Sequence, residues 1–169
     1  MSSSIYNIQA WAGTTAYQQD DIVLYSGLYY YAKSNHTSGA SFDSTLWDGV
    51  TTYNSTTKPY FFWVPSYGSA ANLKPKIKQI KYGDGYEQRV PDGISNNLLT
   101  LDLTFDLMTR NKMTAITHFL NLRGGKEAFV YLPQPPFSLN KLFVCREIPI
   151  VNNFFNNYSM KLVFDEVVN

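Results

Sequence analysis

The fold of this chain is decided by one stretch, Leu99-Thr100-Leu101-Asp102-Leu103-Thr104-Phe105-Asp106-Leu107. Large apolar side chains occupy every second position with polar ones between them, which is the pattern of a β-strand with one buried face. A helical pattern follows, with Thr109 as a suitable N-cap and Gly124-Gly125 as a stop. Between these ends, apolar residues recur at helical spacing, at Met113, Ile116, Phe119 and Leu120. We predict that the apolar face from Leu99 to Leu107 is covered by a helix at about 109–123.

Further strand-like segments lie on both sides of this pair. They occupy residues 60–65, 74–82 and 87–90 before it, and 127–132, 142–147 and 158–164 after it. Most are rich in β-branched and aromatic residues and end at turn residues. Pro133, Pro135 and Pro136 interrupt the connection after 127–132, so that connection is not a central strand. Residues 60–169 are therefore expected to be mainly β with one flanking helix.

The segment Tyr82-Gly83-Asp84-Gly85-Tyr86-Glu87-Gln88-Arg89 allows three interpretations. A phosphate-binding loop would need a Gly-Lys-Ser sequence leading into a helix, which is missing. A calcium loop would need more carboxylate oxygens than Asp84 supplies. A hairpin turn needs only an Asp-Gly pair between two strands, with Gly85 at positive φ. We predict the turn.

Three lysines precede that turn at alternate positions, Lys74, Lys76 and Lys78. In a strand all three side chains point the same way. They form either a solvated edge that discourages stray strand pairing, or a face that meets acidic groups of another subunit.

The first 50 residues predict a separate small β module. Residues 21–25 and 28–32 flank the two-residue turn Ser26-Gly27, which is a hairpin pattern. A hairpin alone is marginally stable, so four aromatic side chains are expected to close a small core around it: Trp11, Tyr17, Phe42 and Trp47. Residues 51–59 have linker composition. We therefore divide the chain into a module at 1–51, a linker at 52–59 and a second domain at 60–169.

Composition narrows the function classes. The net charge is +1, with −3 in residues 1–50 and +4 in the remainder, which gives no reason to expect nucleic-acid binding. Charged residues make up only 16% of the chain and aromatic residues also 16%, which suits a surface that contacts other proteins. No basic segment leads into an apolar run at the start, and no apolar run is long enough to cross a bilayer. We expect a soluble chain made in a cytoplasm, without membrane insertion.

No catalytic or metal site is predicted. His36, His118 and Cys145 are scattered, so they form neither a nucleophile–base pair nor a zinc ligand set, and His118 is expected at a surface or an interface. Asp102 and Asp106 share a strand face, which is also the arrangement of paired acid–base carboxylates, but the solvent side of an amphipathic strand is the favoured interpretation. We predict no catalytic residue, no cofactor, no metal and no enzyme activity.

Residues from about 60 to 169 resemble the minor tail protein M family of lambda-like phages. The resemblance is carried by four segments in order, Phe62-Trp63-Val64-Pro65, Lys74-Pro75-Lys76-Ile77, the 82–89 block and Asp92-Gly93-Ile94-Ser95-Asn96-Asn97. It continues through the helix ending at Gly124-Gly125, the 129–136 strand with its prolines, and the closing Phe164-Asp165-Glu166-Val167-Val168-Asn169. The family usually has Phe where this chain has Tyr82.

This resemblance implies a structural protein of the phage tail tip, located in the virion and assembled in the host cytoplasm. The implied fold is a tail-tube-like β-sandwich or barrel with one flanking helix. The implied partners are further copies of the chain in a hexameric ring, the tail tube protein and other tail-tip proteins, with DNA passing only transiently through the lumen. In that setting one block has a structural or intersubunit role: Gly83, Asp84, Gly85, Tyr86, Gln88 and Arg89.

Residues from about 5 to 50 resemble carbohydrate-binding modules of the chitin- and cellulose-binding type. The match consists of Trp11, Tyr17, Asp21, Val23, Tyr25, Gly27, Tyr30, Ala32 and Trp47. Lys33-Ser34-Asn35-His36-Thr37 stands where that family has adjacent exposed tryptophans. The resemblance makes Trp11, Tyr29 and Tyr31 candidates for stacking on a sugar, although each could equally belong to a core. The alternative function is therefore a glycan-binding host-recognition protein, with the second domain as its mount.

Overall fold

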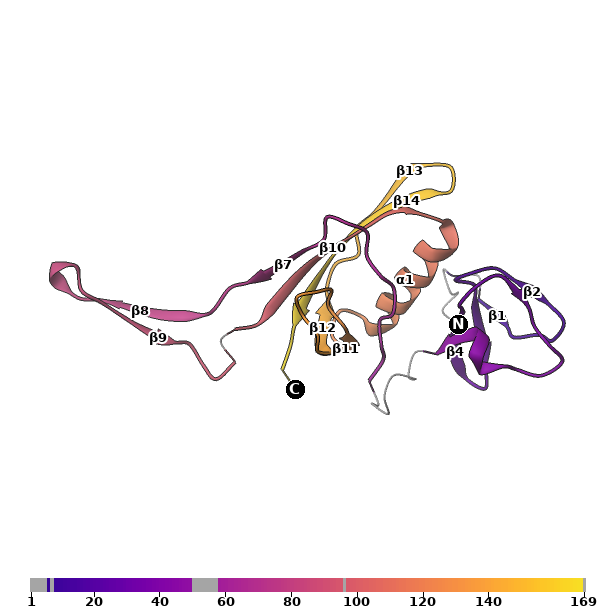
Figure 1. The fold of residues 1–169 in the computed structure, drawn as a ribbon, viewed down its shortest axis with the longest axis horizontal. Helices are drawn as coiled ribbons and strands as arrows, with labels where there is room; N and C mark the ends of the chain where they lie inside the picture. Colours follow the sequence, from indigo (N-terminus) through magenta and orange to yellow (C-terminus); the bar gives the residue numbers. More distant parts are fainter. Residues whose placement is uncertain (1–5, 7, 50–57, 96, 169) are drawn as a thin grey trace.

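A computed structural model describes residues 6, 8–49, 58–95 and 97–168. Figure 1 shows three parts: a central sheet with one helix on it, a front module beside that helix, and a long hairpin that projects from the sheet. The expected linker at 52–59 lies outside the described residues except for its last two positions.

The central sheet has six strands and remains open. Its order is β11-β12-β14-β10-β7, and β13 pairs with β14 beside β12. The strands are β7 (Ala70–Leu73), β10 (Leu99–Met108), β11 (Phe129–Tyr131), β12 (Lys141–Cys145), β13 (Ile150–Phe154) and β14 (Asn157–Glu166). The mainly β fold with one flanking helix is confirmed, but this sheet does not close into a barrel.

The alternating stretch forms β10 as predicted. Leu99, Leu101, Leu103 and Phe105 are buried, and Asp102 and Asp106 are exposed. Leu107 is the exception, because a bulge between Phe105 and Met108 shifts the register there. Its φ is +54° and its side chain is exposed, while Met108 takes the buried position instead.

Helix α1 (Arg110–Arg123) lies where the sequence predicts it. The Thr109 side chain caps its first turn by accepting a hydrogen bond from the Lys112 amide at 3.3 Å. Gly124 ends the helix in the left-handed conformation, with φ at +55°. The helix buries Ala115, Ile116, His118, Phe119 and Leu120.

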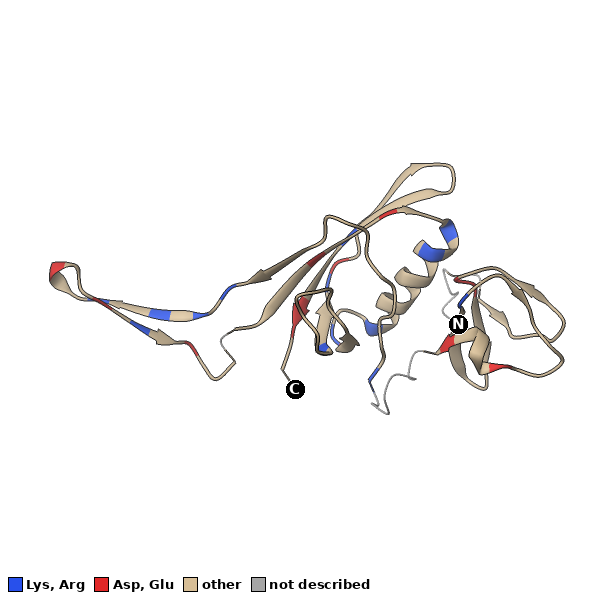
Figure 2. Cartoon of the chain, viewed as in Figure 1, with Lys and Arg blue, Asp and Glu red and all other residues tan. Residues whose placement is uncertain are grey.

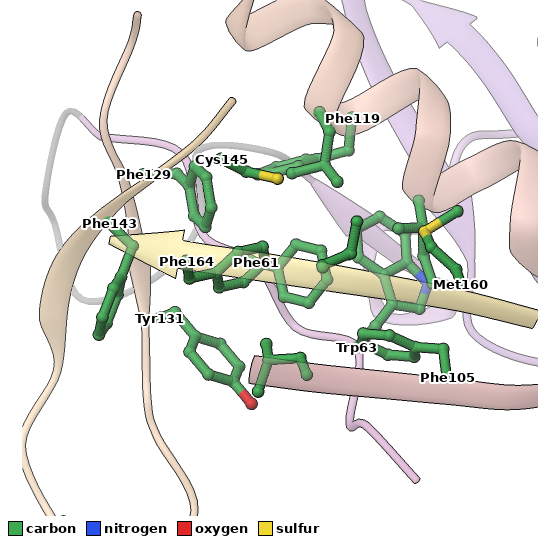
Figure 3. Close-up of a cluster of buried hydrophobic side chains, with 14 of the residues drawn as sticks. Phe61, Trp63, Phe105, Phe119, Phe129, Tyr131, Phe143, Cys145, Met160 and Phe164 are labelled. Carbon is green, nitrogen blue, oxygen red and sulfur yellow. The ribbon is translucent and has the colours of Figure 1, made fainter. Parts of the chain in front are cut away.

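An aromatic core lies between α1 and the sheet. Figure 3 shows it, with Phe119 from the helix and rings from several strands around Phe61. The centroid of the Phe61 ring lies 5.1 Å from that of Phe164 and 5.6 Å from those of Phe119 and Tyr131, mostly in edge-to-face contacts. The segment 60–65, predicted as a strand, makes only one isolated bridge, from Tyr60 to Val130. It crosses the core instead, burying Phe61 and Trp63.

The front module contains two small sheets. One has the order β1-β3-β4-β6 and the other pairs β2 with β5. The strands are β1 (Gln9–Ala10), β2 (Ala16–Tyr17), β3 (Ile22–Tyr25), β4 (Leu28–Ala32), β5 (His36–Thr37) and β6 (Trp47–Gly49), with the 3₁₀ turn η1 (Ser44–Leu46) before β6. The predicted β3–β4 hairpin is confirmed, and its turn has Ser26 and Gly27 both at positive φ. Tyr17 and Trp47 are buried in the module core, with Trp11 and Phe42 packed against them as expected.

The projecting hairpin consists of β8 (Ile77–Lys81), the 3₁₀ turn η2 (Gly83–Gly85) and β9 (Glu87–Pro91). We call residues 74–92 the arm. All of its residues are exposed, and Figure 1 shows it extending away from the sheet.

Replacing Phe164 with Ala should destabilise the protein by about 3–5 kcal/mol, because it opens a cavity among four aromatic rings. The neighbouring substitution Val163→Ala is the control, because that side chain is 45% exposed on the opposite face of β14. Its expected effect is below about 1 kcal/mol. Urea unfolding of the full chain measures both, and equal losses would show that the core is not where this packing puts it.

Candidate functional site

The arm ends in the turn that the sequence predicts. Gly85 has φ at +82°, and Asp84 is also left-handed at +67°, a conformation that Asp tolerates better than most residues. The Tyr82 amide donates to the Tyr86 carbonyl at 2.8 Å and closes the turn. The Tyr82 hydroxyl donates to Gln88 Oε1 at 3.1 Å, and Arg89 forms an ion pair with Glu87. These contacts are all within the arm, so they fix the shape of its tip without linking it to the central sheet.

The two faces of the arm differ in character. Cross-strand partners share a face, so Lys78 and Ile80 lie with Val90 and Gln88, while Gln79 and Lys81 lie with Arg89 and Glu87. Apolar side chains are exposed along the arm, namely Ile77, Ile80, Tyr82, Tyr86 and Val90. A two-stranded hairpin with exposed apolar groups is marginal in water, so the arm is suited to contact with another protein surface.

The arm is also a basic projection. Residues 74–92 hold five cations, Lys74, Lys76, Lys78, Lys81 and Arg89, against three anions, Asp84, Glu87 and Asp92. Figure 2 shows the lysine and arginine positions spread along the hairpin. Lys74 and Lys76 precede β8 and Lys78 lies within it, so only Lys78 occupies a strand position of the predicted alternation.

Two exposed edge strands of the central sheet, β7 and β13, carry no charged residue. Met160 of β14 pairs with Phe105 on one side and with Ile150 of β13 on the other, so β13 lies across β14 from β10. Leu101 of β10 likewise pairs with Phe164 and with Ala71 of β7. The outer edges of β7 and β13 therefore face opposite ways. Both strands are exposed along their whole length and lack charged side chains, which are one of the usual protections against pairing with another strand.

The front module is docked on helix α1 rather than held away from it. Ile22 and Tyr31 of the module belong to the same buried cluster as Phe61, Trp63 and the helix side chains. The Tyr31 ring packs edge-on to Trp63, with 5.1 Å between the ring centroids. The module therefore shares a hydrophobic core with the second domain.

Polar contacts fix the position of the docked module. Trp63 Nε1 donates to Asp20 Oδ1 at 3.1 Å. The amide of Asn111, in the first turn of α1, donates to Asp21 Oδ1 at 2.9 Å and to Gln18 Oε1 at 3.3 Å. These bonds tie the β2–β3 connection to the start of the helix and to the segment before β7, so one relative orientation is favoured.

His118 lies at the centre of this contact and is 3% exposed. Its Nδ1 shares a hydrogen bond with the Tyr31 hydroxyl at 3.0 Å, and the rings of Tyr29 and Tyr6 pack edge-on to the imidazole at 4.8 and 5.1 Å. Burial, reinforced by the positive charge of Arg123, lowers the pKa of His118 from 6.5 to about 4. Burial also raises the pKa of Tyr31 above its usual range. Both groups are therefore neutral at physiological pH.

The three predicted sugar-stacking rings do not form a platform. Tyr31 is fully buried against α1, so its ring is not available for stacking on a sugar in this arrangement. Tyr29 packs on His118 at the same contact. Trp11 lies on the other side of the module, edge-on to Tyr25 and Phe42 at 5.4 and 5.6 Å. Stacking on a pyranose needs coplanar exposed rings, and here two of the three candidates belong to the docking contact.

The positions of Cys145 and Asp102 do not suit catalysis. Cys145 is buried, its thiol donates to the Glu147 carbonyl at 3.2 Å, and burial raises its pKa to about 11, so it carries no thiolate. Asp102 accepts a hydrogen bond from Asn72 Nδ2 at 2.7 Å on the solvent side of β10. Within the described residues no cluster of His, Cys, Asp and Glu is able to hold a metal ion. Of the helices that the structure describes, none has the length and apolar content to cross a membrane.

Sequence reasoning missed the docking contact and both sheet edges. Asp20, Asn111 and Trp63 come from segments 40 or more positions apart, and no local pattern links them. The strands β7 and β13 contain Ala, Asn and short apolar runs without strict alternation, so the strand signal is weak. The sequence signal for the edges was the absence of charge, between residues 59 and 73 for β7 and between residues 148 and 160 for β13.

Comparison with known proteins identifies the family. A family model described as phage minor tail protein matches residues 59–168. This chain belongs to the phage minor tail protein family. The match starts after the front module, so the module lies outside the part that defines the family.

Two individual similarities accompany this assignment. Tail tip protein M of Escherichia phage lambda is 33% identical over 73 residues, which cover 43% of this minor tail protein and 66% of the relative, just under two thirds of its length. A chain in the tail of an empty GTA particle, solved by helical refinement with C6 symmetry, covers 76% of this chain and 89% of its own length. Its identity is 8% and its TM-score is 0.46, which is too low to support a conclusion about assembly.

Removing the Tyr31 hydroxyl tests the docking contact. In Tyr31→Phe the buried His118 Nδ1 loses its partner, and the free energy of unfolding should fall by about 1–3 kcal/mol. Tyr30→Phe is the matched control, because Tyr30 is the next residue on β4 and packs on the module core instead. Its effect should stay within about 0.5 kcal/mol. Urea unfolding of the two variants would contradict the docked arrangement if Tyr31→Phe were the milder change.

Proposed function

We propose that this protein is a non-enzymatic structural component of the tail tip of a long-tailed phage, and that it assembles with copies of itself into a ring. The observation that carries the proposal is the family match over residues 59–168, together with an arm and two sheet edges that have no further strand partner among the described residues. The similarity to a tail tip protein supports the location in the virion.

The arrangement of the open edges supports head-to-tail assembly. The edges of β7 and β13 lie on opposite sides of one sheet, so the β13 edge of one copy can pair with the β7 edge of the next. Each copy then uses two different surfaces, and such a contact forms a closed ring when the rotation between copies closes. We propose six copies, with a lumen through which DNA passes transiently.

The arm supplies a second contact in this proposal. Its length and exposure let it reach beyond its own sheet. Ile80 and Val90, which share one face with Lys78 and Gln88, would be buried against a neighbouring protein. That neighbour is another copy, the tail tube protein or another tail-tip protein. The exposed Tyr86 and the left-handed turn at Asp84 and Gly85 would present the tip of the arm in a fixed shape.

The front module is proposed as a separate unit of sequence, at residues 1–51, added to the family domain at 60–169. Its docking on α1 suits a part that is held in place on the outside of the assembly. A host-glycan role is the alternative proposal, and it would need a binding face other than the one made by Tyr29 and Tyr31.

The assembly proposal predicts that the purified chain forms a closed oligomer through the arm. Ile80→Glu places a charge on the proposed contact face and should raise the dissociation constant of the oligomer about ten-fold or more. The mass measured by light scattering should then shift towards that of the monomer. Gln79→Glu is the control, since the adjacent side chain points to the other face of the same strand. It adds the same charge and should leave the oligomer nearly unchanged.

Two results would count against the proposal. A chain that stays monomeric at all accessible concentrations would contradict self-assembly. An oligomer equally insensitive to both substitutions would place the contact elsewhere than on the arm.

A further inference from the structure

The contact between the front module and α1 buries a histidine, whose imidazole in water would change charge near neutral pH. His118 is buried on the module-facing side of the helix, among rings from two segments of the module, namely Tyr6 from the N-terminal segment and Tyr29 and Tyr31 from β4. Its burial depends on those rings, because they are the groups that cover the imidazole. Detachment of the module would return His118 to water.

The surroundings of His118 suit a neutral imidazole only. The tyrosines that face it are uncharged, and the charge that acts on it comes from Arg123 on the same helix, which is also a cation. Arg123 has its own anionic partner, Glu127, at 2.9 Å. Within the described residues no carboxylate is among the groups that shift His118, so a proton on the imidazole would be buried without compensation.

We propose that the front module is held on α1 by an acid-labile contact, and that uptake of one proton by His118 releases the module from the helix. The proton comes from solvent and adds to the unprotonated ring nitrogen of the neutral imidazole, with no other covalent bond made or broken. The charged ring gains full hydration only when the module leaves, so proton uptake and undocking favour each other.

The sign follows from the two states. His118 has a pKa of about 4 when docked and the ordinary 6.5 when exposed, so the undocked state binds the proton more tightly. Docking is therefore unaffected above pH 6.5 and weakens as the pH falls from 6.5 towards 4. The undocking equilibrium constant should rise about 30-fold between pH 7.5 and pH 5, with a limit of about 300-fold at lower pH.

One other acid at the contact acts in the opposite direction. Burial raises the pKa of Asp20, although the hydrogen bond from Trp63 and the charge of Lys112 oppose the shift. A carboxyl with a raised pKa favours docking as the pH falls, so Asp20 reduces the effect of His118 and cannot produce it. The two residues can therefore be separated by mutation.

Hydrogen exchange at the Trp63 indole N–H measures the undocking directly, because that group donates to Asp20 across the contact. In the full chain, its protection, corrected for the intrinsic exchange rate, should fall about 30-fold between pH 7.5 and pH 5. Backbone amides of β3 and β4 report unfolding of the module itself and should remain protected. Loss of protection at those amides together with Trp63 would replace undocking by unfolding and overturn the proposal.

His118→Asn is the decisive variant, because an amide can keep the hydrogen bond to the Tyr31 hydroxyl without taking up a proton. In this variant, the protection of the Trp63 indole N–H against exchange should stay constant or rise slightly as the pH falls to 5. The same fall in the variant as in the natural chain would overturn the proposal, and so would constant protection in the natural chain. Asp20→Asn, which removes the opposing acid, should keep the pH-dependent loss.

Direct titration of His118 keeps the proposal testable if His118→Asn does not dock at pH 7.5. The chain has two histidines, so the ring C–H signals are easily assigned by nuclear magnetic resonance. Loss of Trp63 protection that follows protonation of His118 supports the proposal. Protonation of His118 with Trp63 protection unchanged would overturn it.

Discussion

The structure depends on burying helix α1 from two sides. Phe119 turns towards the sheet and packs against Phe61 and Phe129, whereas the adjacent His118 turns towards the front module. Consecutive residues on a helix point about 100° apart, so one covering surface cannot shield both. The six-stranded sheet covers the first side and the module covers the second. Without the module, the His118 imidazole and the Trp63 indole would be exposed to water. The module therefore completes the hydrophobic core.

Burial is distributed unevenly as a result. The aromatic side chains around Phe61 are buried, while the arm and the β13 strand are exposed along their whole length. The edge strands β7 and β13 carry no charged residue, although charge is one of the usual protections against pairing with another strand. The buried part provides a stable body, and the exposed parts are available for contacts between molecules. This division is the physical basis for treating a phage minor tail protein as a unit of assembly.

Much of the fold could be predicted because strong local patterns carried it. The strict alternation of β10, the capped helix from Thr109 to Gly124, and the turns at Ser26-Gly27 and Asp84-Gly85 each satisfy a local rule with little competition. Residues 60–65 show where such rules fail. Their aromatic run has high strand propensity, yet the backbone pairs only through Tyr60, because burying Phe61 and Trp63 under α1 outweighs a full ladder. The prediction that Leu107 shares the buried face is also wrong, because a bulge that no local pattern indicates turns its side chain outward.

Local sequence patterns were enough to predict the mainly β class, the position of the helix, the two hairpins, the small module core and the family resemblance of residues 60–169. The role of the aromatic residues of β4 depends on contacts that only the folded chain makes. Tyr29 and Tyr31 have the same alternation whether they face a sugar, solvent or another domain, because period-two patterning states which residues share a face and not what that face meets. The answer came from residues far away in the chain, His118, Asn111 and Trp63, whose contacts with the module are created by folding alone.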